Sequence, residues 1–361
     1  MKRISDKYQI FDKNEVEILA EQLESGKLSG TSVAIQDYED DLSQFFDAKF
    51  AVAVSSGTAA IQVALFSLGL SKGDKVMLTP TCPMMTVYPI IFAGLVPVFV
   101  DTEADSFGFD IEDVVKKFDS KVRAVIDIPM WGYPMDVKKR QEFCHSHDLL
   151  YILDLAQAHG SKFGGKYLSK YCDVACFSTH DRKILSTGEG GFILTDDRQT
   201  AESAKSFTQF GFMKGVDFGL NYKLGALQAT IGKNRLKQVN SQLVKRKENS
   251  DLLRSLIKNN SVSEFKITER GTANYYTYLL SLRFKDNLGF IKYLEEKGIP
   301  SDITRYSYLP LYELPAFLEY GTVCANAELL SKTITTIPVH PGITVDDIQY
   351  IAECINLYEE R

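Results

Sequence analysis

Seven short apolar runs between residues 50 and 195 constrain the fold of this chain more than any other feature. Each run is continuously apolar instead of alternating with polar residues, which is typical of strands buried on both faces of a mostly parallel sheet. The runs cover 50–55, 75–80, 96–101, 123–129, 149–154, 174–178 and 191–195. Helical patterns separate most of them, so the sequence predicts an α/β domain in which helices flank a mostly parallel seven-stranded sheet.

The pattern changes near residue 222, where a proline-free helical stretch extends to residue 257. Beyond it the sequence predicts a strand over 274–284 and helices over 286–299 and 344–358. A chain of 361 residues is longer than one compact core usually allows. We therefore expect a large α/β domain over residues 1–240 and a smaller C-terminal α+β domain over residues 241–361.

Composition and charge argue against several kinds of partner. A formal net charge of −6 and a pI near 5.5 disfavour a nucleic-acid partner, which would require a basic surface. The N-terminus shows no apolar signal sequence, and no apolar run is long enough to span a bilayer, so we expect no membrane association. The six cysteines are dispersed, which is typical of free thiols in a reducing cytoplasm.

One pair of cysteines has a spacing that raises the question of a metal. Cys172 and Cys176 form "CDVAC", but no second cysteine pair accompanies them. The segment also has the pattern of a buried strand, in which cysteine behaves as a small hydrophobic residue. No metal site is expected.

Polar residues follow the predicted strands at the points where ligands bind in parallel sheets. After the first strand, "SSGTAAI" (55–61) opens a helix whose free N–H groups favour a phosphate, although a simple helix cap explains the motif equally well. Asp154 ends the fifth strand, where a desolvated carboxylate is costly unless it meets a cation or caps a helix. Lys183 follows the sixth strand, between Ser178 and the glycine-rich segment 188–191.

These three features together favour pyridoxal 5′-phosphate as the ligand. This cofactor carries a phosphate, a ring nitrogen that works best protonated, and an aldehyde that forms a Schiff base with lysine. A nicotinamide cofactor would require a G-x-G-x-x-G turn, and a nucleotide phosphate loop would require G-x-x-x-x-G-K-[ST]. Neither motif is present in the sequence.

Four motifs in this order and spacing make the chain resemble the DegT-type sugar aminotransferases. They are "SSGTAAIQVAL", "DLAQAHG", "FSTHDRKILSTGEGG" and "GLNYKLGALQATIG". The resemblance covers nearly the whole chain, as far as "PLYELPAF" and "IPVHPGIT" near its end. It implies the fold-type I architecture of pyridoxal-phosphate enzymes and a homodimer with active sites at the subunit interface.

The resemblance implies roles for three residues around the ring of the cofactor. Lys183 would form the Schiff base, Asp154 would pair with the pyridine nitrogen, and Gln157 would lie beside the ring hydroxyl. Asp154 would keep the nitrogen protonated, so that the ring can accept electrons from the substrate carbanion. Lys183, displaced by the donor amino acid, would then move the proton as a general base and acid.

The resemblance also implies a phosphate site that draws on two subunits. Gly57, Thr58 and Ser178 would hold the cofactor phosphate within one chain. Asn221, in "LNYKLG", would reach the phosphate from the other subunit. His159, His340 and Trp131 are further candidates to line the site, although packing roles are more common for such residues.

Several positions depart from the pattern of the family. Leu153 stands where an acidic residue is common, and Lys223 stands where an arginine is common. His180 and Asp181 replace an aromatic residue and a proline. These departures leave the expectation of cofactor binding intact and leave the substrate open.

The expected loop "TPTCPMMTVYP" (79–89) also departs from the family. It lacks the aromatic ring that usually stacks on the cofactor, so Met84 or Met85 would cover the ring, or would instead fill the core. The same loop resembles the dehydratase branch of the family, in which a histidine replaces the lysine. Lys183 therefore favours transamination over dehydration.

We expect a pyridoxal-phosphate-dependent aminotransferase that moves an amino group from an amino acid, by family habit L-glutamate, to a keto-sugar. The sugar is expected to be nucleotide-linked, and its identity and the aminated carbon stay open. Two alternatives remain at this point. One is a keto-sugar 3-dehydratase that uses the same cofactor, and the other is a non-catalytic regulatory or binding protein on the same scaffold.

Overall fold

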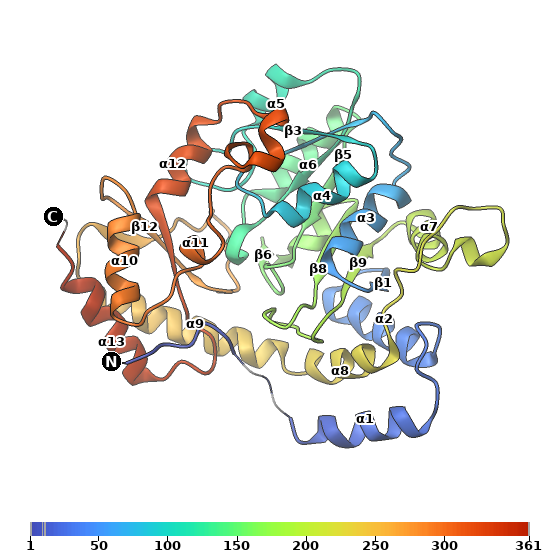
Figure 1. Cartoon of the computed structure of the whole chain (residues 1–361), viewed down its shortest axis with the longest axis horizontal. Helices are drawn as coiled ribbons and strands as arrows, with labels where there is room; N and C mark the ends of the chain where they lie inside the picture. The colour runs from blue at the N-terminus through green and yellow to red at the C-terminus, as the bar shows by residue number, and fades with distance from the viewer. Residues whose placement is uncertain (1, 9, 11, 360–361) are drawn as a thin grey trace.

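A seven-stranded sheet forms the centre of the molecule (Figure 1). The computed structural model describes residues 2–8, 10 and 12–359. The strand order is β1-β9-β8-β5-β4-β2-β3, and β9 is antiparallel to both of its neighbours. The strands are β1 (Phe50–Val54), β2 (Lys75–Leu78), β3 (Val96–Phe99), β4 (Val122–Asp127), β5 (Leu150–Asp154), β8 (Val174–Ser178) and β9 (Gly191–Thr195). All seven predicted strands are therefore confirmed, as is the mostly parallel sheet.

Helices cover both faces of this sheet, and successive residues of a strand enter two different cores. In β5, Ile152 packs into one hydrophobic cluster, while Tyr151 and Leu153 pack into the other. Burial on both faces explains why the strands are continuously apolar. The helices of this part are α1 (Asn14–Glu24), α2 (Val33–Phe46), α3 (Gly57–Ser67), α4 (Met84–Phe92), α5 (Ile111–Lys117), α6 (Val137–Ser146) and α7 (Arg198–Thr208).

The helical stretch predicted over 222–257 is two helices, α8 (Ala226–Leu236) and α9 (Val239–Leu256). Between them the N–H of Gln238 donates to the carbonyl of Arg235, three residues back, at 2.9 Å. This tight turn interrupts the α-helical hydrogen bonds, which are made to the fourth preceding residue. No proline or glycine marks the break, so the sequence pattern did not reveal it.

A smaller antiparallel sheet follows α9 in the chain. Its strand order is β10-β12-β13, and it is accompanied by helices that appear together at the left of Figure 1. The predicted strand over 274–284 and the helices over 286–299 and 344–358 are confirmed with shorter bounds. The elements are β10 (Val262–Glu264), β12 (Tyr278–Leu282), α10 (Leu288–Glu296), α11 (Asp302–Arg305), α12 (Ala325–Thr333), β13 (Ile334–Ile337) and α13 (Val345–Asn356).

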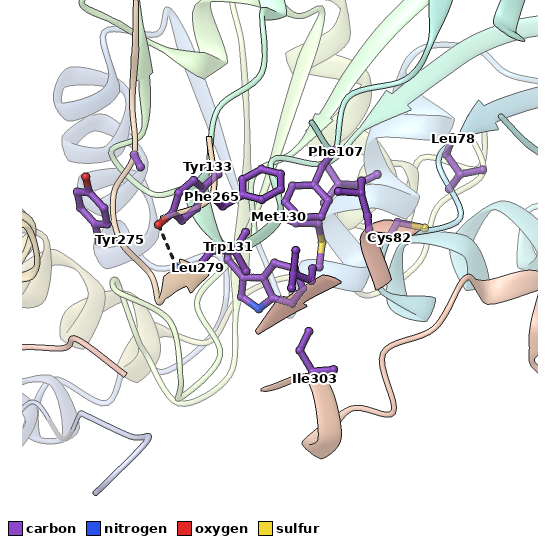
Figure 2. Packing of buried hydrophobic residues seen from close by; sticks show 14 of the residues in the cluster. Leu78, Cys82, Phe107, Met130, Trp131, Tyr133, Phe265, Tyr275, Leu279 and Ile303 are labelled. Carbon is purple, nitrogen blue, oxygen red and sulfur yellow. Dashed lines mark hydrogen bonds between the residues drawn. The ribbon is translucent and has the colours of Figure 1, made fainter. Parts of the chain in front are cut away.

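Segments from both sides of residue 240 pack together. The short strand β11 (Gly271–Thr272) pairs with β6 (Lys162–Phe163), which also pairs with β7 (Lys166–Tyr167). In Figure 2, Phe107 and Phe265 stack with ring centroids 5.0 Å apart, and Tyr133 accepts a hydrogen bond from the N–H of Leu279 at 3.0 Å. The domain boundary at residue 240 stays a prediction.

Candidate active site

The carboxyl ends of the parallel strands meet at one edge of the large sheet and bring the predicted site residues together. Ser178 ends β8 and lies opposite Gly191 of β9, which in turn lies opposite Val54 at the end of β1. Asp154 ends β5, the next strand beyond β8. Gly57 opens α3 directly after β1. Three motifs that are far apart in the sequence therefore occupy one edge.

The N-terminus of α3 is both capped and open. The side chain of Ser56 accepts a hydrogen bond from the N–H of Ala59 at 3.0 Å, which is the ordinary cap. The N–H groups of Gly57 and Thr58 have no acceptor among the described residues. A Cβ atom at position 57 would lie 2.6 Å from Cβ of Ser178, so only glycine allows this approach. The helix cap is therefore present, and the two neighbouring N–H groups leave room for the predicted phosphate site, which stays a prediction.

The Asp154 carboxylate is buried and held from two sides. Oδ2 accepts a hydrogen bond from the hydroxyl of Thr86 at 2.7 Å, and Oδ1 accepts one from the N–H of Ala156 at 3.0 Å. Burial raises the pKa of Asp154, while these hydrogen bonds and the charge of Lys183 oppose that rise. The group is suited to face a cation.

The sequence did not reveal Thr86 as the partner of Asp154. The segment 79–89 was expected to be a loop, and that expectation is wrong from Met84 onward because α4 begins there. Pro89 lies inside this helix, and a proline normally indicates a helix boundary. The first turn of α4 directs Thr86 to Asp154, whereas Met85 is exposed.

Lys183 lies on the segment between β8 and β9, and its backbone is tightly placed. Its N–H donates to the carbonyl of His180 at 2.8 Å, and the next two residues, Ile184 and Leu185, are fully buried. Desolvation lowers the pKa of Lys183 to about 8, although the carboxylates of Asp154 and Asp302 act to raise it. The amine is thus held between two acids at a pKa close to neutrality.

Aromatic residues border the lysine on the side of the smaller sheet. The Nζ atom of Lys183 lies 5.4 Å from the ring centroid of Tyr276. The backbone N–H of Trp131 donates to Oε1 of Gln157 at 2.7 Å, and the Trp131 side chain acts to lower the pKa of Asp302. Trp131 is only 2% exposed, so it fills the core and its backbone also positions Gln157.

A small cavity lies beside Lys183. Its wall includes Arg182, Tyr276, Asp302, Arg246 and His340. Four of these five residues lie beyond residue 240. Among the five, only His340 was a candidate from the sequence. The smaller sheet and its helices thus complete a site that begins at the edge of the large sheet.

Comparison with known proteins identifies the family. The model of the DegT/DnrJ/EryC1/StrS aminotransferase family matches residues 9–356. This chain belongs to that family. It is 28% identical to a GDP-perosamine synthase of Escherichia coli O157:H7, over 95% of this chain and 94% of the relative. It is 27% identical to a GDP-perosamine synthase of Vibrio cholerae, over 96% of each chain.

A solved structure shows the same fold. An aminotransferase of Helicobacter pylori, involved in the biosynthesis of pseudoaminic acid, superposes with a TM-score of 0.90 at 22% identity and covers 98% of both chains. The chain is accordingly a sugar aminotransferase of the DegT/DnrJ/EryC1/StrS family, with the fold-type I architecture that its motifs predicted.

Two of the departures from the family pattern have local explanations in this aminotransferase. Leu153 is fully buried in the core behind the site. Asp181 forms an ion pair with Lys7, which ties the lysine-bearing segment to the N-terminal segment of the chain. The neighbouring Arg182 pairs with Asp6 at 2.8 Å and adds a second such tie. The segment 180–182 is thus anchored by charges rather than by a proline.

The remaining candidates differ in their positions. Asn221 is exposed, and its Oδ1 accepts a hydrogen bond from Lys223 at 2.6 Å; no hydrogen bond joins it to the other six predicted site residues. His159 is buried against Phe177, and burial lowers its pKa to about 3. His340 lines the cavity, and burial lowers its pKa to about 4. Both histidines are neutral at pH 7.

Proposed function

We propose that this aminotransferase uses pyridoxal 5′-phosphate to move an amino group from L-glutamate to a nucleotide-linked keto-sugar. The observation that carries the proposal is the meeting of three groups at one sheet edge: the amine of Lys183, the buried carboxylate of Asp154 and the open N-terminus of α3. The names of the perosamine synthases support a sugar acceptor carried on a nucleotide.

The residues present fit this cofactor. The two amide groups without acceptors at Gly57 and Thr58, and the contact between Gly57 and Ser178, form a cradle suited to a phosphate. In the part of the chain that the structure describes, Asp154 is a buried acid without an arginine partner, and a protonated pyridine nitrogen would supply the cation. A lysine whose pKa is about 8 has an amine that is reactive near neutral pH.

The bound cofactor would supply an aldehyde for amine exchange and a ring that accepts an electron pair. Asp154 would hold a proton on the ring nitrogen, and Gln157 would lie beside the ring hydroxyl. Lys183 would carry a proton to and from the reacting carbon through its Nζ atom. Retention of a lysine at this position supports transamination rather than dehydration.

We also propose that the enzyme works as a homodimer. Asn221 is exposed, and among the described residues it makes no hydrogen bond to the other predicted site residues of its own chain. In a dimer, Asn221 would reach the phosphate site of the partner subunit.

In the described part of the chain, every helix is too short or too polar to span a membrane.

Substitution of the lysine tests the assignment. After borohydride reduction of the protein mixed with pyridoxal phosphate, we expect mass spectrometry to locate the cofactor on Lys183. Lys183→Ala should lose the adduct and all amine transfer, while retaining the circular dichroism of the parent. The control is Lys166→Ala, which removes an exposed lysine of β7. A labelled lysine elsewhere, or an unchanged adduct in Lys183→Ala, would overturn the assignment.

The substrate requires a separate assay. Release of 2-oxoglutarate from L-glutamate should depend on the presence of a keto-sugar nucleotide. Turnover of such a sugar with pyridoxamine phosphate, but with no amino donor, would instead indicate a dehydratase.

A further inference from the structure

Arg246 is a buried cation that has no carboxylate partner among the described residues. Its side chain is on α9, and the residue is 4% exposed. The Nη1 atom donates to the carbonyls of Tyr275 and Tyr276 at 3.2 and 2.9 Å. The Nε atom is buried and has no acceptor in the described part of the chain. Burial lowers the pKa of this guanidinium to about 10, which leaves it charged at neutral pH.

The other deeply buried arginine provides a contrast. Arg140 is fully buried and faces Asp127 at 3.3 Å and Glu103 at 2.8 Å. No carboxylate of the described residues lies within ion-pair distance of Arg246. A buried charge without a counter-ion is costly, so its presence indicates a ligand that supplies the missing negative charge.

Arg246 opens onto the cavity that contains Lys183. Tyr276 lies between them: its ring centroid is 5.4 Å from Nζ of Lys183, and its carbonyl is bonded to Arg246. A negatively charged group beside Arg246 would therefore belong to a molecule close enough to place another of its groups at the lysine.

The net charge of the cavity wall favours a ligand group that carries a single negative charge. The charged residues of the wall are Arg182, Lys183, Arg246, Asp6 and Asp302, which leave one positive charge in excess. Asp6 already pairs with Arg182. His340 is neutral at pH 7 because its pKa is about 4. A carboxylate balances this excess, whereas a diphosphate would add charge opposite Asp6 and Asp302.

We propose that Arg246 binds a carboxylate group of the amino donor in the cavity beside Lys183. The proposal rests on the proposed function, because the donor must bring its amine to this lysine. It assigns the recognition of the amino acid to a residue of α9 that none of the cofactor motifs contains.

The test uses glutarate, which has the carboxylates of the donor but no amine, and the protein loaded with pyridoxal phosphate. Calorimetry should show that Arg246→Gln weakens glutarate binding at least tenfold, because a charge-assisted hydrogen bond is lost. The glutarate affinity of Arg246→Lys should lie between those of the parent and of Arg246→Gln. The control is Lys247→Gln on the same helix, which removes an exposed cation and should leave binding unchanged. Equal glutarate affinity in the parent and a folded Arg246→Gln would overturn the proposal.

A measurement on the unaltered protein guards against a variant that does not fold. Glutaramide, the uncharged diamide of glutarate, should bind at least tenfold more weakly than glutarate. Pyrophosphate is the second probe: if Arg246→Gln weakens pyrophosphate binding but not glutarate binding, the site serves the nucleotide and the proposal is wrong. Glutarate binding requires no chemical step, so loss of sugar amination alone would count against the proposed function and not against this site.

Discussion

At the scale of single residues, the central feature is a lysine amine between two acids. A pKa of about 8 leaves roughly 10% of the Lys183 amine uncharged at pH 7, against roughly 0.03% for a lysine at its ordinary pKa of 10.5. Desolvation provides the shift, while Asp154 and Asp302 limit it. The two acids lie on different elements, β5 of the large sheet and the helix α11 of the C-terminal part. The reactivity of the lysine therefore depends on both parts of the chain.

This arrangement predicts a pH dependence. The cofactor-free protein should react with pyridoxal phosphate at a rate that rises with pH around a midpoint near 8, because only the uncharged amine is a nucleophile. Asp302→Asn should move the midpoint to lower pH, since the removed negative charge favours the ammonium form. Asp105→Asn is the control, because Asp105 is exposed, pairs with Lys266 and is not among the charges that shift the pKa of Lys183. A midpoint that rises in Asp302→Asn would contradict this account; absorbance stopped-flow measurements provide the rates.

Only part of this site was predictable from the sequence. Asp154 ends one apolar run and Lys183 follows the end of another by five residues, and strand ends are where parallel sheets bind ligands. Asp302 and Arg246 carry no such signal, because α9 and α11 bring them to the lysine through tertiary packing. Trp131 was assigned with preference to the core, and its backbone N–H donates to Gln157 from a turn in which Trp131 has a positive φ of 52°.

At the scale of elements, the strands were predictable because burial on both faces makes them continuously apolar. Helix α4 was not predictable, because Pro89 lies inside it and a proline normally indicates a helix boundary. The turn between α8 and α9 was also not predictable, since it contains ordinary helix-forming residues and arises from packing. Local patterns thus identify elements whose burial is uniform, and they miss breaks and starts that depend on tertiary contacts.

The position of α4 has a measurable consequence. Thr86→Val keeps the shape of the side chain but removes a hydrogen bond to the buried Asp154 carboxylate. Loss of a bond to a charged group costs about 1.5–3 kcal/mol, or roughly 3–12 °C of melting temperature at about 2–4 °C per kcal/mol. Thr81→Val is the control, because it removes a bond between two neutral hydroxyls at 3.1 Å. Calorimetric scans of the cofactor-free protein at neutral pH should rank the two; a smaller effect for Thr86→Val would be inconsistent with a charged Asp154.

At the scale of the whole molecule, one surface segment is unusually apolar. Residues 210–218 follow α7 and project from the right of Figure 1. Five large apolar side chains of this segment are exposed, including Met213 at 84% and Val216 at 82%. Exposed apolar patches of this kind mark interaction surfaces. The segment leads into Asn221, which is the residue proposed to serve the partner subunit.

The segment and Asn221 together predict that dimer formation and cofactor binding are linked. Met213→Asp combined with Val216→Asp should shift a dimer toward monomer, because two charges would be buried in an apolar contact. The same variant should bind pyridoxal phosphate more weakly, since each phosphate site would lose the partner's Asn221. Val115→Asp with Val323→Asp, at other exposed positions, is the control. Light scattering gives the mass, and absorbance titration gives the affinity. A monomeric parent would contradict the dimer, and a monomeric variant with full cofactor affinity would show that each chain holds the phosphate alone.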